Sequence, residues 1–442
     1  MPRYFLEDQL IERNRLCFKG KIALVFSGGG ARGGYQIGCW KALEDSKIKI
    51  DGAYGTSVGS MNAAAVAQGD LDLAIETWKE MDYSAVMVVT PEIKHILDMV
   101  EKGLGLREVF RALKMALEGK GIDTEPLRRT LNSLVCEEKI RGSGIDVGLV
   151  TYSLSEMKPL LLYLDEIPEG KLVDYILASA NYPVFKRAEL DRKRFIDGGI
   201  YMNIPVQMPK NRGFEDVILV DIGTRSLIDR WNLITSSFEE SRTLYIRPRV
   251  HFGGPMQFSK TISRQYMVEG YLDTMTALGV FKGKYTYVFE TIDVLPLLLQ
   301  GLSEEDFAEA LSIIGIKASQ TESPMYFYFR QLLPVLEEGL GVEGSRDCFA
   351  ALADLFFEVF ELERFELYAG RDFFEMNSEE AAGDQRLYGI MINDILLSDL
   401  LRMLSFVYEK SRNSFDRPGS YRLYRASLES LGKPRAQSSE HS

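Results

Sequence analysis

The stretch DGAYGTSVGSMNAAAVAQG, residues 51–69, decides the expected fold because it joins two kinds of secondary structure through a serine. A short strand-like run leads into a G-x-S-x-G pattern, in which Gly55 and Gly59 flank Ser57, and an alanine-rich helical run closes at Gly69. Glycines at this spacing permit a sharp strand-to-helix turn that projects the serine into solvent. The turn also places Ser57 at a helix N-terminus, where free N–H groups favour negative charge. By itself the pattern also fits a glycine-bounded loop that happens to carry a serine.

Strand-like and helix-like segments alternate outward from this turn, between residue 21 and about residue 290. We expect strands over 21–27, 51–54, 144–154, 158–168, 216–224 and 243–248, and helices over 35–48, 58–69 and 171–180. This alternation predicts an α/β fold with a largely buried sheet. The helical stretch from about 90 to 134 is expected to be an insertion, either a lid over the site or an ordinary helix pair.

The pattern changes after residue 290, where only helix-periodic segments are apparent. We therefore expect four regions: an N-terminal segment 1–20, an α/β domain 21–290, a helical domain 291–432 and a disordered tail 433–442. The length of 442 residues agrees with two domains, because single cores stop growing at roughly 250–300 residues. Ser303 with Asp306 resembles a capping box at the start of one of these helices.

Composition excludes several classes of function. The net charge of −12 disfavours binding to nucleic acid, and the four cysteines and three histidines are too few and too scattered for a zinc site or a disulfide framework. We expect no metal. The polar N-terminus lacks the apolar core of a signal peptide, and no segment is long and apolar enough to span a membrane. The sequence therefore predicts a cytoplasmic protein, while signal-independent secretion stays open.

A second glycine cluster, SGGGARGG at residues 27–34, follows the first expected strand. Consecutive glycines expose backbone N–H donors, which an acyl-transfer site needs for its oxyanion. The candidate donors are Gly28, Gly29 and Gly30, with the N–H of Val58 beside the serine. Arg32 is expected to hold the loop or to meet an anionic headgroup.

The same cluster also satisfies the dinucleotide-binding pattern G-x-G-x-x-G, through Gly28, Gly30 and Gly33. Such sites need an acidic residue about 20 positions further on, at the end of the next strand. Asp45 and Asp51 lie near that distance, but Asp51 precedes the next strand instead of ending it. The dinucleotide alternative is therefore weaker but stays open.

The serine needs a base, and two residues are candidates. His251 would complete a triad in the order Ser–Asp–His, although its position favours an ordinary loop or surface histidine. Asp197 follows a short strand and precedes Gly198 and Gly199, so its carboxylate is free to approach a neighbouring hydroxyl. An aspartate serves as base only where its site is shielded from water. From spacing alone, a simple Asp-Gly turn is the favoured interpretation, because such turns are common.

Three elements in this order, GGGARGG, GTSVGS and DGG, resemble those of the patatin-like phospholipase family. The block ILASANYPVF, residues 176–185, is similar to the family's A-S-x-x-x-P-x-x-F run, and DGGIYMNIPV, residues 197–206, is similar to D-G-G-x-x-x-N-x-P. The resemblance covers residues 21–290. Asn181 and Lys186 depart mildly from the family pattern near the substrate-facing loop.

The resemblance implies a three-layer α/β/α sandwich, here with a second, all-helical C-terminal domain. It implies a Ser57–Asp197 dyad without a catalytic histidine, an oxyanion hole at Gly28–Gly30, and a loop behind the aspartate shaped by Asn203 and Pro205. The implied activity is hydrolysis of lipid acyl esters without metal or cofactor, with transient contact to a membrane surface and no nucleic-acid partner. Two other functions stay open: an esterase with a Ser-Asp-His triad, and a non-catalytic lipid-binding scaffold.

Overall fold

The computed structural model describes residues 18–101, 121–186, 188–190, 192–223, 243–283, 287–289, 294–316, 323–360, 367–369, 384–387, 390–393, 395–411 and 419–433. These residues fall into two compact units. The described residues of Arg13–Ala277 and of Ser427–Ser442 form one, the sheet unit, and those of Leu278–Ala426 form the other, the helical unit. The chain therefore changes unit at Leu278, before the expected boundary at 290, and returns at Ser427. The expected segments 1–20 and 433–442 lie almost wholly outside the described residues.

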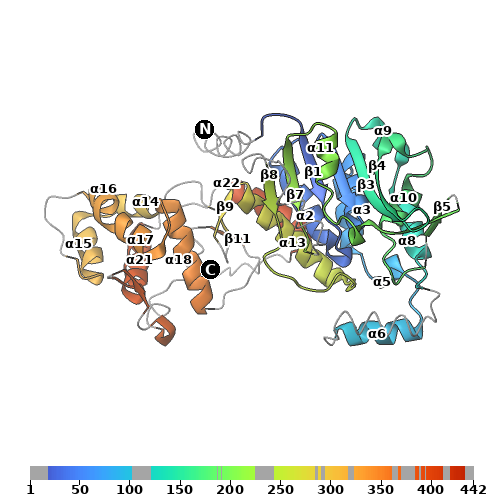
Figure 1. The fold of residues 1–442 in the computed structure, drawn as a ribbon. Coiled ribbons are helices and arrows are strands. Elements are labelled where there is room, and N and C mark those ends of the chain that lie inside the picture. Colours follow the sequence, from blue (N-terminus) through green and yellow to red (C-terminus); the bar gives the residue numbers. More distant parts are fainter. Residues whose placement is uncertain are drawn as a thin grey trace. The chain divides into compact units, whose positions relative to one another are not determined.

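Eight strands build the sheet of the sheet unit, within its described residues (Figure 1). They are β1 (Ile22–Phe26), β2 (Gly52–Thr56), β3 (Asp146–Ser153), β4 (Lys158–Tyr163), β5 (Ala188–Leu190), β6 (Lys193–Asp197), β7 (Asp216–Val220) and β8 (Thr243–Ile246). Their order is β5-β6-β3-β2-β1-β7-β8, with β4 paired to β3. β1, β2, β3, β7 and β8 run parallel, while β4, β5 and β6 pair antiparallel. The predicted α/β fold is thus confirmed.

The central strands of the sheet are buried on both faces, as is typical of parallel strands covered by helices. In β1, β2 and β7 every residue is buried. Side chains alternate between two apolar clusters: Val147 and Leu149 of β3 belong to one, and Val150 belongs to the other. Ala64 lies in the first cluster and Met208 in the second, so helical residues cover each face.

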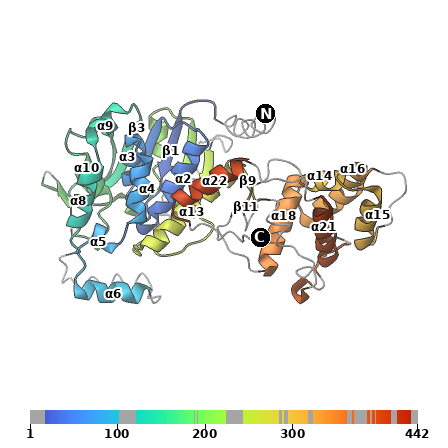
Figure 2. The ribbon, with the colours of Figure 1, turned by 180° about the vertical axis from the view of Figure 1, so that it is seen from behind.

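Helices lie on both sides of this sheet. Helix α11 (Gln207–Asn211) lies in front of the sheet in Figure 1, whereas α2 (Gly34–Asp45), α3 (Val58–Gln68) and α4 (Leu71–Lys79) lie in front of it in the view from behind (Figure 2). The other helical elements of the unit are η1 (Gly30–Gly33), α5 (Tyr83–Val86), α6 (Pro91–Glu101), α8 (Glu125–Leu134), α9 (Glu137–Gly142), η2 (Leu164–Glu166), α10 (Leu172–Ser179), η3 (Gly198–Ile200) and α13 (Lys260–Ala277). Part of the expected insertion, residues 102–120, lies outside the described residues.

Helices α2 and α13 approach so closely that only glycine fits at their crossing. A Cβ on Gly38 of α2 would lie 1.9 Å from the backbone oxygen of Met267, and one on Gly270 of α13 would lie 2.0 Å from that of Tyr35. Because this clash is with backbone atoms, no side-chain movement relieves it. The glycine that ends the GGYQIG run therefore serves helix packing and not anion binding.

The helical unit has its own apolar core, to which Phe307, Tyr328, Phe349 and Leu401 contribute. Its helical elements are α14 (Val294–Gln300), α15 (Glu304–Ile313), α16 (Pro324–Phe327), the π-helix η5 (Tyr328–Leu332), α17 (Leu333–Leu340), α18 (Ser345–Phe360), η6 (Gln385–Leu387) and α21 (Leu397–Ser411). Of the capping box expected at Ser303, the structure has one half: Ser303 Oγ accepts the Asp306 N–H at 3.1 Å, whereas the Asp306 carboxylate accepts the Ser303 hydroxyl at 2.7 Å and not the Ser303 backbone N–H.

The helical unit also contains short strands that the sequence did not indicate. Two of them precede residue 290, β9 (Phe281–Lys282) and β10 (Tyr287–Phe289). Three lie where the sequence indicated helices alone: β11 (Leu367–Ala369), β12 (Met391–Ile392) and β13 (Ile395–Leu396). Segments of two or three residues are too short to show a period of two, so they left no recognisable pattern. In the described parts of the chain, no helix has the length and apolar character needed to cross a membrane.

Candidate active site

Ser57 lies on a sharp turn between β2 and α3, as its spacing predicts. Its backbone adopts φ 56° and ψ −127°, a conformation that non-glycine residues rarely accept. A Cβ on Gly55 would lie 2.1 Å from the Gly59 oxygen, and one on Gly59 would lie 2.5 Å from the Phe26 oxygen. Both glycines are therefore required by crowding of the backbone around the serine.

The register of β3 brings Asp197 to this serine. Thr56, the last residue of β2, pairs with Val150 of β3, and Asp197, the last residue of β6, pairs with the next residue, Thr151. The strands β2 and β6, which pair with opposite edges of β3, thus end at neighbouring positions along it. As a result, Ser57 Oγ donates a hydrogen bond of 2.6 Å to Asp197 Oδ2.

The Asp197 carboxylate is oriented and shielded. Its Oδ1 accepts the N–H of Gly199 at 2.7 Å, which leaves Oδ2 facing the serine. The residue is 5% exposed, and this burial raises the pKa of its carboxyl from 3.8 to about 6, while the hydrogen bonds from Ser57 and Gly199 oppose the rise. A Cβ on Gly198 would lie 2.3 Å from the Val150 oxygen, so the Asp-Gly-Gly corner needs its first glycine to reach β3.

The glycine loop after β1 lies on the other side of the serine. The N–H of Gly28 donates to the Asn203 oxygen at 3.1 Å, and Asn203 Nδ2 donates to the Gly28 oxygen at 3.1 Å. This reciprocal pair joins the two loops of the site, and it gives the Gly28 N–H an acceptor of its own. Of the expected oxyanion donors, Gly28 is therefore engaged elsewhere.

The remaining expected donors face an open cavity. Gly29, Gly30 and Val58 all line it, and within the described residues their N–H groups form no hydrogen bond. Gly30 has φ +57°, and a Cβ there would lie 2.0 Å from the Pro255 oxygen. Glycine is therefore required where the loop turns toward the serine.

Arg32 and Gly33 support the glycine loop from outside the cavity. Arg32 Nε donates to the Gly253 oxygen at 3.0 Å, and its Nη1 donates to the Ile222 oxygen at 3.1 Å. Arg32 thus holds the loop to two other segments, which was one of its two expected roles. A Cβ on Gly33 would lie 2.4 Å from the Trp78 ring.

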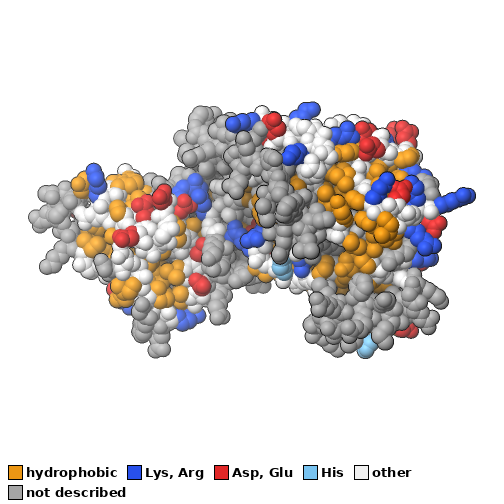
Figure 3. Space-filling model, viewed as in Figure 1, with side chains coloured by type: hydrophobic (Ala, Val, Ile, Leu, Met, Phe, Trp, Pro, Cys, Tyr) orange, Lys and Arg blue, Asp and Glu red, His pale blue; other side chains and the backbone are white. Residues whose placement is uncertain are grey.

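The cavity in front of Ser57 has a volume of about 350 Å³ and is mostly apolar. Polar groups gather at one place, around Ser57, Asp197 and Asn203. The apolar lining includes Met61, Trp78, Met81, Leu127, Phe185, Ile200, Met256 and Phe258. Ile200 is also 53% exposed, and Figure 3 shows a broad area of hydrophobic side chains on this unit above α6. The site therefore combines a few polar groups with an apolar chamber, as sites for apolar small molecules do.

Residues 24–209 match the family described as patatin-like phospholipase. The chain carries a patatin-like phospholipase domain. Ser57, Asp197 and the glycine loop all lie within the matched range.

Curated relatives agree with this assignment. Patatin-like phospholipase domain-containing protein 7 of Rattus norvegicus is 24% identical over 225 residues, which cover 49% of this chain and 15% of the rat protein. Protein 6 of the same series, from Homo sapiens, is 25% identical over 211 residues, which cover 47% of this chain and 14% of the human protein. The chain thus matches about one seventh of the length of these relatives. VipD from Legionella pneumophila, a solved structure, has 14% identity and a TM-score of 0.34, with 93% of this chain and 90% of that chain covered.

Several supports of the patatin-like domain carried no assigned role in the sequence. Ser179, at the end of α10, accepts the Ser57 backbone N–H on its Oγ at 2.9 Å and donates to the Val150 oxygen at 2.6 Å. Asn181 Nδ2 donates to the Phe195 backbone oxygen at 3.0 Å, and the Asn181 backbone oxygen accepts the Asp197 N–H at 2.9 Å. Both residues lie in the ILASANYPVF block, which was the one available signal.

A buried polar chain supports the glycine loop of the patatin-like domain from beneath. Asn62 Nδ2 donates to the Gly33 oxygen at 3.0 Å and to Gln36 Oε1 at 2.8 Å, and the Trp78 indole donates to Asn62 Oδ1 at 3.0 Å. These three side chains fix the loop to α2, α3 and α4. Nothing in their spacing marked them, because hydrogen bonds between helices depend on tertiary packing.

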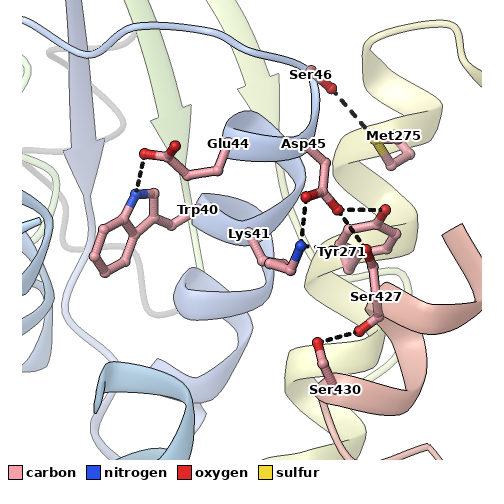
Figure 4. A network of polar contacts seen from close by, with 9 residues as sticks. All are labelled: Trp40, Lys41, Glu44, Asp45, Ser46, Tyr271, Met275, Ser427 and Ser430. Atoms are coloured by element: carbon pink, nitrogen blue, oxygen red, sulfur yellow. Dashed lines mark hydrogen bonds and ion pairs between the residues drawn. The ribbon is translucent and has the colours of Figure 1, made fainter. Parts of the chain in front are cut away.

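The residues of the alternative functions lie away from the cavity. His251 does not line it, and partial shielding of its imidazole from water, together with the nearby Arg32 cation, lowers the pKa of that imidazole. Asp51 Oδ2 accepts the Ile22 N–H at 3.1 Å. Asp45 binds Lys41, the Tyr271 hydroxyl at 2.9 Å and the Ser427 hydroxyl at 2.7 Å (Figure 4). Asp45 thus ties the returning helix α22 (Gly419–Ser430) to α2, a structural role.

Proposed function

We propose that this chain is a lipid acyl hydrolase in which Ser57 is the nucleophile and Asp197 is its base. The observation that carries the proposal is the 2.6 Å hydrogen bond from Ser57 Oγ to Asp197 Oδ2, at the polar end of an apolar cavity. A nucleophile hydrogen-bonded to an oriented base is the arrangement that covalent acyl transfer requires. The backbone N–H of Gly199 supplies that orientation.

In the first half of the reaction, Ser57 Oγ attacks the ester carbonyl carbon while its proton passes to Asp197 Oδ2. Negative charge then develops on the carbonyl oxygen, and the N–H groups of Gly29, Gly30 and Val58 are the proposed donors to it. The carbon–oxygen bond to the leaving alcohol breaks, and the alcohol takes the proton from Asp197. The products are the free alcohol and an acyl ester on Ser57.

In the second half, water attacks the acyl-enzyme and gives its proton to Asp197. Collapse of this second tetrahedral intermediate breaks the bond to Ser57, which takes the proton back, and the fatty acid leaves. One carboxylate therefore serves as base and acid in turn. Its pKa of about 6 suits this work, because the group is ionised at neutral pH and yet more basic than an exposed aspartate.

The substrate class follows from the lining of the cavity. Burial of methylene groups stabilises a bound acyl chain by about 0.8 kcal/mol each, and the apolar lining favours such a chain over a polar substrate. The patatin-like phospholipase names of the relatives agree with lipid esters. The proposal extends to acyl esters of lipids as a class.

The test is a panel of phospholipids, glycerides and simple esters assayed with four proteins: wild type, Ser57→Ala, Asp197→Asn and the exposed-serine control Ser133→Ala. We expect Ser57→Ala and Asp197→Asn to lose about a thousandfold or more in kcat/KM, while Ser133→Ala keeps wild-type rates. A fluorophosphonate probe should label wild type and fail to label Ser57→Ala.

Two results would contradict the proposal. Near-normal hydrolysis by Asp197→Asn would show that the aspartate is not the base, and it would favour a Ser-Asp-His triad with His251. A wild-type protein that binds lipid without hydrolysing any ester, and that the probe does not label, would indicate a lipid-binding scaffold instead.

A further inference from the structure

We propose that Met61 sets the longest acyl chain that this site accepts, because its side chain closes the catalytic cavity against a second apolar cavity. The inference rests on the proposed lipid acyl hydrolase activity. It concerns a specificity-determining residue and not the chemical step.

The second cavity lies between α3, α4 and α8, beside the first. Its volume is about 70 Å³, and its lining is predominantly apolar, with Ala65, Leu73, Ala74, Leu131 and Leu134 among the lining residues. Four residues line both cavities: Met61, Trp78, Met81 and Leu127. These four side chains are therefore the wall between the two spaces.

The periodicity of α3 shows how the two cavities follow one another. Val58, Met61, Ala65 and Gln68 recur at intervals of three and four residues, so they share one face of the helix. Val58 lines only the catalytic cavity, Met61 lines both, and Ala65 and Gln68 line only the second. With a rise of about 1.5 Å per residue, Met61 lies about 6 Å along the helix axis from Ser57. A chain that runs from the serine along this face meets Met61 first and the second cavity behind it.

Of the four wall residues, Met61 is the one best suited to decide passage. The Trp78 ring is fixed by its hydrogen bond to Asn62 at 3.0 Å and by packing against Gly33. Met61 is half-buried, and its unbranched thioether side chain has no polar group to anchor it. Loss of its side chain beyond Cβ would join the two cavities without disturbing the hydrogen bonds that hold the glycine loop.

The test measures kcat/KM for p-nitrophenyl esters from butanoate to stearate. Met61→Ala should extend the range to longer chains, with at least a tenfold gain on the first esters that wild type rejects, because one methylene in an apolar pocket changes kcat/KM by about tenfold or more. Leu127→Ala, which opens the same wall from α8, should extend the range in the same direction. It also provides a second route if Met61→Ala folds poorly.

Two matched variants separate the wall from a general enlargement of the site. Met256 lines the catalytic cavity but not the second, so Met256→Ala removes the same atoms and should leave the length limit in place. Ala65 lines only the second cavity, so Ala65→Leu should cancel the gain of Met61→Ala and leave wild type unchanged.

The inference is overturned if Met61→Ala and Leu127→Ala keep the wild-type limit, or if Met256→Ala extends it equally. It is also overturned if Ala65→Leu fails to cancel the gain. In each of these results wild type still hydrolyses esters, so the proposed function stands. A wild-type protein without esterase activity and without fluorophosphonate labelling overturns the proposed function, and the inference with it.

Discussion

Replacement of Asp197 by asparagine should abolish hydrolysis and at the same time stabilise the sheet unit above pH 6. The two effects have one cause, the burial of an ionised carboxylate. Asparagine has nearly the same shape, and its amide keeps both contacts: Oδ1 accepts the Gly199 N–H, and Nδ2 donates to Ser57 Oγ. What the substitution removes is the charge, which the reaction needs and the folded protein tolerates poorly.

The magnitude follows from the pKa of the Asp197 carboxyl. Burial raises this pKa from 3.8 to about 6, a shift of about two units, and each unit corresponds to about 1.4 kcal/mol. Below pH 3.8 the carboxyl is protonated in the folded and unfolded states alike, so it has no effect on stability. Between pH 3.8 and 6 the unfolded state ionises first, and folding stability falls with rising pH. Above pH 6 the full loss of about 3 kcal/mol is present, and Asp197→Asn should recover it.

The assay is urea unfolding followed by tryptophan fluorescence. Trp40 and Trp78 are buried in the sheet unit, so a change in their fluorescence reports the unfolding of that unit. Asp197→Asn should raise the unfolding free energy by about 3 kcal/mol at pH 8 and by nearly nothing at pH 3.5. Ser57→Ala is the control, because it removes a hydrogen bond to the carboxylate but keeps the charge, so it should destabilise by about 1–2 kcal/mol at pH 8. An Asp197→Asn protein that is less stable than wild type at pH 8, or equally stabilised at both pH values, would refute the reasoning.

Four further outcomes are expected. The rate kcat/KM should fall tenfold per pH unit below about pH 6, because protonated Asp197 no longer accepts the serine proton, and a stopped assay across pH 4–8 measures this; a flat profile would contradict it. Burial, followed by the neighbouring Asp273 carboxylate, raises the pKa of Glu269 to about 9, so wild-type stability should decline from pH 6 to 9, whereas that of Glu269→Gln should stay level over this range in the same urea titrations. Gly38→Ala should destabilise the sheet unit by about 3 kcal/mol or more through its backbone clash, whereas Gly142→Ala, an open helical position, should be neutral or stabilising, and equal effects would disprove the packing argument. Leu431→Ala should lower the unfolding free energy of the sheet unit, measured by tryptophan fluorescence, by about 2–5 kcal/mol, because this fully buried residue groups with that unit. An unchanged unfolding free energy would show that Leu431 does not stabilise the sheet unit.

The sequence predicted those parts of the site that local backbone geometry dictates. At Gly55, Gly59 and Gly198 a Cβ would lie within about 2.5 Å of a backbone oxygen, so only glycine fits. A position that accepts only glycine can be recognised in a single sequence, because the glycine itself marks it. The strands were predictable for a related reason, since burial on both faces imposes a continuous apolar run. The helical unit was recognisable from its periodicity, whereas its strands of two and three residues were not.

The engagement of Gly28 shows the limit of such reasoning. Three adjacent glycines offer three equivalent N–H groups, but pairing with Asn203 removes one of them from the cavity. The role of Ser179 is equally hidden, because its hydroxyl reaches the Ser57 N–H only after α10 packs against β3. Each of these contacts joins residues more than 100 positions apart, and the sequence of one element says nothing of its partner.

The register of β3 gives a physical reason for the Ser57–Asp197 pairing that the family resemblance implied, whereas nothing in the sequence marked the cavity. Thr56 ends β2 and Asp197 ends β6 at adjacent residues of β3, so this register brings Ser57, the residue after Thr56, close to Asp197. The cavity has no such constraint: its wall residues come from three separate stretches, Met61 from α3, Trp78 and Met81 from the end of α4 and the residues after it, and Leu127 from α8, and each looks like an ordinary core residue. The crowded backbone near the catalytic residues thus requires glycines, which the sequence shows. The accepted acyl-chain length depends on side-chain volume, which many apolar residues provide equally well. Chain-length preference should therefore change by substitution at Met61 while Ser57, Asp197 and their glycines keep the same geometry.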